Sequence, residues 1–213
     1  MASTTRERRP TWELTDLLVP LQGSWTVEKY LNLDTNRLIE FTDGYLEFLP
    51  MPEEFHYFVQ QFIFAAVEAF LKTRGKGAAR YAPFKVRVRE GAFREPDVCI
   101  LLDENDRRRG RKYWDGADFV IEVVSPDGEQ RDYEDKRSEY AAANIPEYWV
   151  VDPQRKELLI LRLSGNQYVD GGSLRPGDVA KSAVLDGFQI DVGQCFNEMN
   201  KASPHDDPPS VKD

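Results

Sequence analysis

The pattern of apolar and polar positions divides the chain into two helical stretches and a series of short strands. Residues 53–73 carry apolar side chains at the three- and four-residue spacing of one buried helical face. Glu53 and Glu54 suit the positive N-terminal end of such a helix, and Gly75 after it favours a stop. A second, shorter helix is predicted over residues 131–143.

Strand-like segments surround the two helices. Residues 37–41 and 45–49 flank an Asp43-Gly44 pair, which predicts a β-hairpin, and residues 84–89 alternate apolar and basic side chains. Further elements are predicted as strands at 96–102, 118–125, 148–152 and 157–163, an irregular strand pair at 181–192, a loop at 171–177, and a short helix at 26–31 with Ser24 as candidate N-cap. This order predicts an α/β (α+β) fold in which a mixed β-sheet is flanked by helices.

The composition fits one folded domain with a tail at each end. The chain has 213 residues, of which 41% are hydrophobic and 31% charged, a balance typical of a globular domain with a substantial core. We expect a partly disordered leader at 1–24, a single domain at 25–195 and a disordered tail at 196–213. No apolar run approaches the ~20 residues of a membrane span. The absence of a secretory signal and two cysteines without metal-binding spacing favour a cytoplasmic location.

The charge of the chain is unevenly distributed. The formal net charge is −9, which argues against a nucleic-acid partner, yet residues 72–112 contain 13 Lys and Arg against 6 Asp and Glu. Such a segment can place a basic face on the molecule, but charged runs of this kind also arise as ordinary solvated strand and loop surfaces. Both interpretations remain open from the sequence.

Two carboxylates interrupt apolar, strand-like segments. Asp97 opens the apolar run 98–102, and Glu122 lies inside the run 119–124. A buried carboxylate is costly unless it is paired or bound to a metal. Together with the backbone carbonyl of Val123, the two acids offer the oxygen ligands of a Mg²⁺ or Mn²⁺ site and predict metal-dependent phosphodiester hydrolysis. The alternatives are that Asp97 caps a turn and that Glu122 pairs with an arginine.

Asp132 and Lys136 lie four residues apart on the predicted second helix and so share one face. One interpretation is a surface ion pair worth roughly a few tenths of a kcal/mol. The functional interpretation directs Lys136 toward the two strand carboxylates, with Asp132 orienting it. His56, near the start of the long helix, presents a similar choice between a surface residue or cap and a ligand.

Four motifs in the second half of the chain occur together in one known family. They are Arg94-Glu-Pro-Asp97, Phe119-Val-Ile-Glu-Val-Val-Ser-Pro126, Arg131-Asp-Tyr-Glu-Asp-Lys136-Arg-Ser-Glu-Tyr140 and Asn144-Ile-Pro-Glu-Tyr-Trp-Val-Val-Asp152. In this order and spacing they closely resemble the Uma-type putative restriction endonuclease family (the DUF820 group) of the PD-(D/E)XK nuclease superfamily. The resemblance extends over about residues 26–192 and implies a restriction-endonuclease-like fold.

The resemblance implies roles for the acids and the lysine. Asp97 corresponds to the superfamily's proline-preceded metal aspartate, and Glu122 to the acidic residue of its second motif. The superfamily lysine would fall at Val124, so the resemblance implies that Lys136 on the following helix has taken its place. Asp132 would then orient Lys136.

The resemblance also covers the start of the long helix. Asp43-Gly44, Met51-Pro52 and His56 match the family's order there, and the family often carries histidine at the position of His56. Glu54, with Glu53 behind it, is the candidate for an acid that the superfamily's first helix often adds. Tyr45 departs from the pattern, because the family often has Glu after the Asp-Gly pair.

The sequence therefore predicts an endonuclease that hydrolyses DNA with Mg²⁺ or Mn²⁺ and acts as a homodimer, with strands in 148–163 as candidates for pairing across a two-fold axis. A rival is a catalytically silent nuclease-fold module that binds DNA or protein. A third interpretation is a nuclease for RNA or for damaged or branched DNA. If Lys136 does the work of the superfamily lysine, Lys136→Ala should abolish cleavage. The loss of stability should be small, because Lys136 is expected to be an exposed helical lysine.

Overall fold

Two β-sheets form the centre of the molecule in a computed structural model that describes residues 21–35, 37–126 and 128–197. Most of the predicted leader and of the predicted tail lies outside the described residues. The sequence predicted one mixed sheet flanked by helices; the mixed α+β single domain is confirmed, with its strands divided between two main sheets and a two-stranded ribbon. Both main sheets contribute residues to the candidate site described below.

The larger sheet has six strands in the order β11-β10-β9-β8-β6-β3. Its strands are β3 (Ala78–Tyr81), β6 (Val98–Leu101), β8 (Phe119–Val123), β9 (Glu147–Asp152), β10 (Glu157–Ser164) and β11 (Gln167–Leu174). Only the pairing of β8 with β9 is parallel; the other pairings within this sheet are antiparallel. Every residue of β6, β8 and β9 is buried, as expected for central strands covered on both faces.

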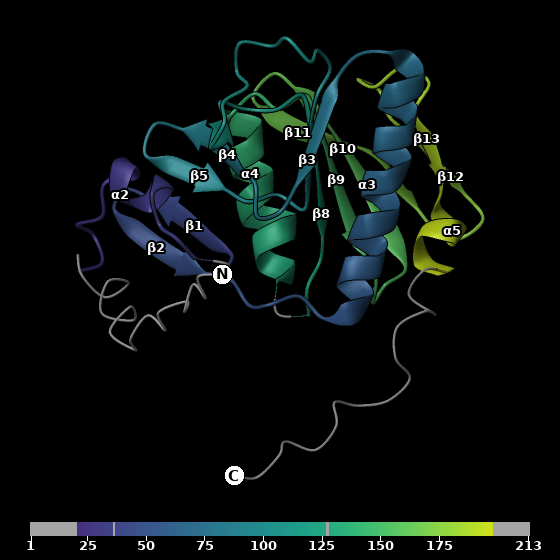
Figure 1. Cartoon of the computed structure of the whole chain (residues 1–213). Helices are drawn as coiled ribbons and strands as arrows, with labels where there is room; N and C mark the ends of the chain where they lie inside the picture. Colours follow the sequence, from purple (N-terminus) through teal and green to yellow (C-terminus); the bar gives the residue numbers. More distant parts are fainter. Residues whose placement is uncertain (1–20, 36, 127, 198–213) are drawn as a thin grey trace, which may run out of the picture.

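The second sheet has five strands in the order β2-β1-β5-β4-β7. They are β1 (Ile39–Thr42), β2 (Tyr45–Phe48), β4 (Lys85–Arg89), β5 (Ala92–Arg94) and β7 (Tyr113–Trp114). The predicted hairpin is β1–β2, and its turn requires left-handed backbone at Asp43 (φ 47°) and Gly44 (φ 91°). This sheet lies beside α4 and away from α3 (Figure 1).

The long helix α3 (Glu54–Arg74) covers one face of the six-stranded sheet (Figure 1). Its buried stripe is Val59, Ile63, Val67 and Leu71, which pack with apolar side chains of β6, β8 and β9. Gly75 ends the helix in the left-handed conformation (φ 70°). The ribbon β12 (Val179–Lys181) with β13 (Gln189–Asp191), and α5 (Val192–Asn197), complete the same layer.

The opposite face of the six-stranded sheet is covered by the second helical stretch. It begins as a π-helix, η1 (Arg131–Asp135), and continues as α4 (Lys136–Ala142), whereas the sequence predicted one regular helix over 131–143. Tyr140 and Ala141 of α4 pack on this face of the sheet with β4. A π-turn of this kind is rare and is frequently found at functional sites.

Three further sequence predictions are wrong in detail. The predicted loop 171–177 is largely strand β11, and the short helix α2 (Val27–Leu31) is capped by Thr26 rather than Ser24. The strands of 148–163 are no exposed edge, because β9 lies between β8 and β10, and β10 lies between β9 and β11. The homodimer prediction therefore loses its candidate interface strands and rests on the superfamily resemblance alone. No helix in the described part of the chain is long and apolar enough to cross a membrane.

Candidate active site

The two predicted acids meet where β6 begins and β8 ends. Val98 pairs with Ile121 in the antiparallel ladder, so the residues next to them, Asp97 and Glu122, come to lie opposite one another. The Asp97 amide donates to Glu122 Oε2 at 3.3 Å, and Asp97 Oδ2 accepts from the Val123 amide at 2.7 Å. Both side chains are buried. The structure thus brings together the acids that the sequence singled out.

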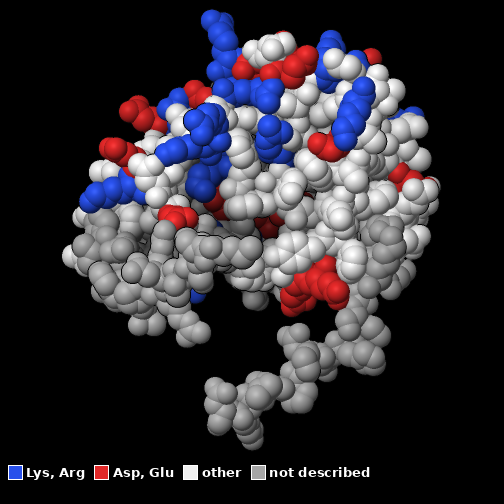
Figure 2. All heavy atoms as spheres, viewed as in Figure 1, with Lys and Arg blue, Asp and Glu red and all other residues white. Residues whose placement is uncertain are grey.

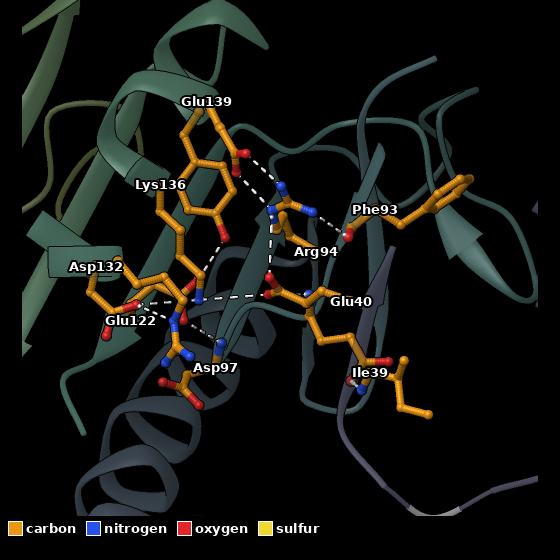
Figure 3. A network of polar contacts seen from close by, with 12 residues as sticks. Ile39, Glu40, Phe93, Arg94, Asp97, Glu122, Asp132, Lys136 and Glu139 are labelled. Carbon is orange, nitrogen blue, oxygen red and sulfur yellow. Dashed lines mark hydrogen bonds and ion pairs between the residues drawn. The ribbon is translucent and has the colours of Figure 1, made fainter. Parts of the chain in front are cut away.

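Lys136 lies inside the molecule and points at these acids (Figure 3). Its Nζ is 2.8 Å from Glu122 Oε1, 3.4 Å from Asp132 Oδ1 and 3.7 Å from an oxygen of Glu40, and the side chain is only 3% exposed. The alternative of a surface ion pair is therefore wrong, as is the expectation that Lys136 is an exposed helical lysine. Burial alone would lower the pKa of Lys136, but the three carboxylates raise it and keep the ammonium charged.

Two tyrosines hold this side of the site in place. The Tyr140 hydroxyl donates to Glu122 Oε1 at 2.5 Å, and the Tyr148 hydroxyl donates to the backbone carbonyl of Asp132 in the π-turn at 2.7 Å. Gly128 precedes the turn, where an added Cβ would lie 3.0 Å from Asp132 Oδ2. These contacts fix the turn that delivers Asp132 and Lys136 to the same buried point.

Asp97 is paired from the opposite layer, by residues of α3. His56 Nε2 lies 3.2 Å from Asp97 Oδ2, and Gln60 Nε2 donates to the Asp97 carbonyl at 3.0 Å. His56 is buried, so the surface or cap interpretation is wrong. Its Nδ1 is buried without a hydrogen-bond partner among the described residues. Burial lowers the pKa of His56, but the charge of Asp97, the hydrogen bond to it and the Val123 carbonyl together raise it.

The two acids differ in their affinity for protons. Burial raises the pKa of Glu122 to about 7. The negative charges of Asp97 and Asp132 also favour the protonated form, and the positive charge of Lys136 opposes this rise only in part. Burial also disfavours ionised Asp97, but His56 and the Val123 amide lower its pKa below the usual range. Asp97 is therefore ionised near neutral pH, whereas Glu122 is poised to gain or lose a proton there.

The site contains charged residues that the sequence did not identify. Glu40 of β1 is buried beside Lys136, and its Oε2 lies 3.5 Å from Nε of Arg94. Arg94 of β5 also binds Glu139 of α4 through Nε at 2.7 Å and through a second nitrogen. Figure 3 shows this chain of charges running from Lys136 through Glu40 and Arg94 to Glu139. The sequence signals were that Arg94 begins the first family motif and that Glu139 lies within the third; Glu40 had none.

Glu54 is not among the buried charges of the site. It begins α3 on the exposed surface, and Glu53, the residue before the helix, is exposed as well. The catalytic role predicted for Glu54 stays a prediction. Tyr45, where the family often has Glu, is 58% exposed on β2.

A pocket of about 380 Å³ opens on the Lys136 side of the site. Its charged lining includes Glu40, Arg94, Arg131, Lys136 and Glu139. The lining also includes Glu47 and Asp135, so it has four carboxylates against three cations. The three cations are the groups of this pocket that could contact a phosphate.

The metal ligands expected from the sequence are present but already paired. Asp97 is paired with His56 and Glu122 with Lys136, and no group of three His, Cys, Asp or Glu in the described ranges is arranged to hold a metal ion. The donor set of Asp97, Glu122 and the Val123 carbonyl nevertheless fits a hard divalent cation. The unpartnered Nδ1 of His56 shows that the buried hydrogen bonding is incomplete there. Cation binding at this point would require His56 and Lys136 to shift.

Comparisons with known proteins identify a family and a structural neighbour for the chain. The family described as "Uma2: Putative restriction endonuclease" matches residues 27–193, which is most of the chain. A solved structure of a putative nuclease belonging to DUF820 from Anabaena variabilis ATCC 29413 is similar, with a TM-score of 0.66 and 16% sequence identity over 82% of this chain and 99% of that one. At this identity the likeness shows the fold alone. No curated protein matches the chain.

Proposed function

The chain belongs to the Uma2 family, described as putative restriction endonucleases, and on that premise we propose that it is a nuclease that hydrolyses DNA phosphodiester bonds with Mg²⁺ or Mn²⁺. The observation that carries the proposal is the buried cluster of Asp97, Glu122 and Lys136 at the ends of β6 and β8. A fully buried set of unlike charges is costly to maintain and is typical of a functional site.

Asp97, Glu122 and the Val123 carbonyl are the groups that would hold the cation. When bound there, a divalent cation lowers the pKa of a water ligand and offsets negative charge on a phosphate. His56 contacts Asp97 at 3.2 Å and is the residue placed to complete or replace this ligation. The cation would also stabilise ionised Glu122, whose pKa burial raises.

Lys136 supplies positive charge to the phosphate side of the site. Its ammonium lies between Glu122 and the pocket that Arg94 and Arg131 line, so a small shift would direct it at a phosphate oxygen or at the attacking hydroxide. Asp132, at 3.4 Å, and the π-turn that carries it orient Lys136. This supports the assignment of Lys136 to the role of the superfamily lysine.

One observation favours a second candidate, a catalytically silent nuclease-fold module that binds DNA or protein. Both acids already have an internal cation, since His56 faces Asp97 and Lys136 faces Glu122. A site that balances its own charges in this way binds a metal only if these contacts are exchanged. If the protein is such a module, it should be folded and stable but should not cleave DNA.

Nicking of supercoiled plasmid distinguishes the two candidates. The wild-type chain should nick DNA with Mg²⁺ or Mn²⁺ and not with EDTA, and Asp97→Asn should lose this activity. Asp118→Asn is the matched control, because Asp118 precedes the other end of β8 and is paired with Arg108. Wild-type protein that is folded but cleaves neither plasmid nor single-stranded circular DNA with either metal would favour the silent module.

A further inference from the structure

A groove between α3 and β3 begins next to Asp97 and is lined by exposed aromatic rings. The pocket has a volume of about 520 Å³, and its lining includes Tyr57, Gln60, Gln61, Phe64 and Tyr81. Tyr57 is 45% and Tyr81 53% exposed, although large aromatic side chains usually bury most of their surface. Tyr81 is held edge-on against Phe64, with ring centres 4.6 Å apart. The Tyr81 ring is therefore packed on one side while remaining open to solvent.

This aromatic groove is joined to the candidate active site through Gln60. One side of Gln60 lines the groove, and its amide donates to the Asp97 carbonyl at 3.0 Å. Tyr81 is also close in the fold, because it pairs with Val98, the residue after Asp97. A molecule lying in the groove would thus end at Gln60, which is one hydrogen bond away from Asp97.

Beyond the rings, the groove continues into a basic pocket of about 390 Å³. Its lining includes Lys72, Lys76, Arg80 and Arg109, and it shares Glu68 with the aromatic groove. Glu68 pairs with Lys72 at 3.1 Å, and Glu104 accepts from a backbone amide, so the lining keeps a net positive charge. Figure 2 shows Lys and Arg side chains gathered over the upper part of this face and acidic atoms in a recess below them.

We propose that this groove and the basic pocket beside it bind an unpaired DNA strand and lead it toward Asp97, with bases stacked on Tyr57 and Tyr81 and phosphates on Lys72 and Lys76. The inference rests on the proposed nuclease function and specifies its substrate as DNA with a single-stranded segment. Exposed aromatic rings together with a cationic groove are the common design of proteins that bind single strands without sequence preference.

A paired duplex fits this arrangement poorly. In a duplex the faces of the bases are covered by their neighbours, so rings such as Tyr81 have nothing on which to stack. An unpaired strand exposes these faces. From Tyr57 to Lys72 the helix rises roughly 22 Å at 1.5 Å per residue, which accommodates a strand of several nucleotides and agrees with known single-strand site sizes of about 4–16 nucleotides.

Equilibrium binding in EDTA tests the proposal without cleavage. We would measure fluorescence anisotropy of a labelled 20-nucleotide DNA strand, of the matching blunt duplex and of the RNA strand of the same sequence. The single DNA strand should bind at least about tenfold more tightly than the duplex. Tyr57→Ala and Tyr81→Ala should each weaken strand binding about tenfold, whereas Tyr81→Phe should bind normally because it keeps the ring.

Tyr45→Ala is the matched control, since Tyr45 is similarly exposed (58%) but lies on β2, outside the groove. A strand carrying 2-aminopurine reports stacking directly: its fluorescence should fall on binding to wild-type protein and less so with Tyr81→Ala. Lys76→Ala should reduce the salt dependence of strand binding by about one phosphate contact. Melting temperatures of all variants exclude unfolding as the cause.

Equal binding of strand and duplex, or unchanged binding by both tyrosine variants, would overturn the proposal. Tighter binding of RNA than of DNA would overturn the assignment of the substrate as DNA. A protein that binds the single strand through these tyrosines but nicks no DNA would support the groove and contradict the nuclease. A protein that nicks DNA without preferring single strands would support the nuclease and contradict the groove. The failure of one proposal is therefore distinguishable from the failure of the other.

Discussion

Replacement of Lys136 by methionine tests how the buried charges hold the fold together. Methionine keeps an apolar stem of similar length, with sulfur in place of the δ-methylene of lysine, and removes the ammonium group. In the wild-type protein that ammonium lies 2.8 Å from Glu122, 3.4 Å from Asp132 and 3.7 Å from Glu40, and all four side chains are at most 3% exposed. Solvent therefore screens this cluster very little.

The expected loss of stability is large for a helical lysine. Removing one partner of a buried ion pair leaves an uncompensated charge and typically costs about 3–5 kcal/mol, against about 0.5 kcal/mol for a surface substitution. Part of the cost should be relieved by protonation of Glu122, whose pKa burial already raises to about 7. We therefore expect Lys136→Met to lower the free energy of unfolding by about 3 kcal/mol near neutral pH.

Urea denaturation followed by far-ultraviolet circular dichroism measures this free energy. Lys181→Met is the control, because Lys181 is exposed on β12. The double variant Lys136→Met with Glu122→Gln should recover much of the loss, since a neutral pair of similar volume replaces a buried ion pair at little cost. A change below about 0.5 kcal/mol for Lys136→Met, or a double variant that loses the sum of both single effects, would refute the reasoning.

Four further predictions concern cation binding, the pH dependence of stability, the buried Glu147 and the oligomeric state. Glu122 must be ionised to bind a cation, and its pKa is raised to about 7, so Mn²⁺ affinity measured by calorimetry should rise from pH 6 to pH 8. Because the pKa of Glu122 in the folded protein, about 7, lies above the ordinary glutamate value of 4.5, its contribution to stability should fall as pH rises from about 4.5 to about 7, and Glu122→Gln should remove this dependence. Glu147→Ala should cost about 3 kcal/mol in urea melts, since this buried carboxylate accepts bonds from the Trp149 indole and from the 182–184 segment. Light scattering at micromolar concentration should report a homodimer; a monomer would remove that prediction.

Much of the site could be predicted from the sequence, because an acid within an apolar, strand-like run is expected to be buried. Glu122 stands between apolar β-branched residues, and Asp97 opens the next apolar run, so a need for partners followed directly. Antiparallel pairing of β6 with β8 then brings them together. The family motifs added the link to Lys136.

The remaining residues could not be predicted because their burial depends on how the layers stack. Glu40 alternates with Ile39 and Phe41 on a hairpin strand, a pattern that normally places a glutamate in water. Here β1 lies between β2 and β5 and faces α4 across the site, so both of its faces are covered. The π-turn likewise has no sequence signal of its own; it depends on the Tyr148 hydroxyl, which reaches it from β9.

The rate of plasmid nicking by Lys136→Met, corrected for the folded fraction, tests the central claim most directly. If Lys136 acts on the phosphate or the attacking hydroxide, the rate should fall by ~10²–10³ relative to wild-type protein. Lys136→Arg should restore little of it, because a planar guanidinium does not replace a compact ammonium in a tight site. Folded Lys136→Met that nicks DNA as fast as the parent would contradict the claim and leave the Asp97–Glu122–Lys136 cluster as a structural charge network.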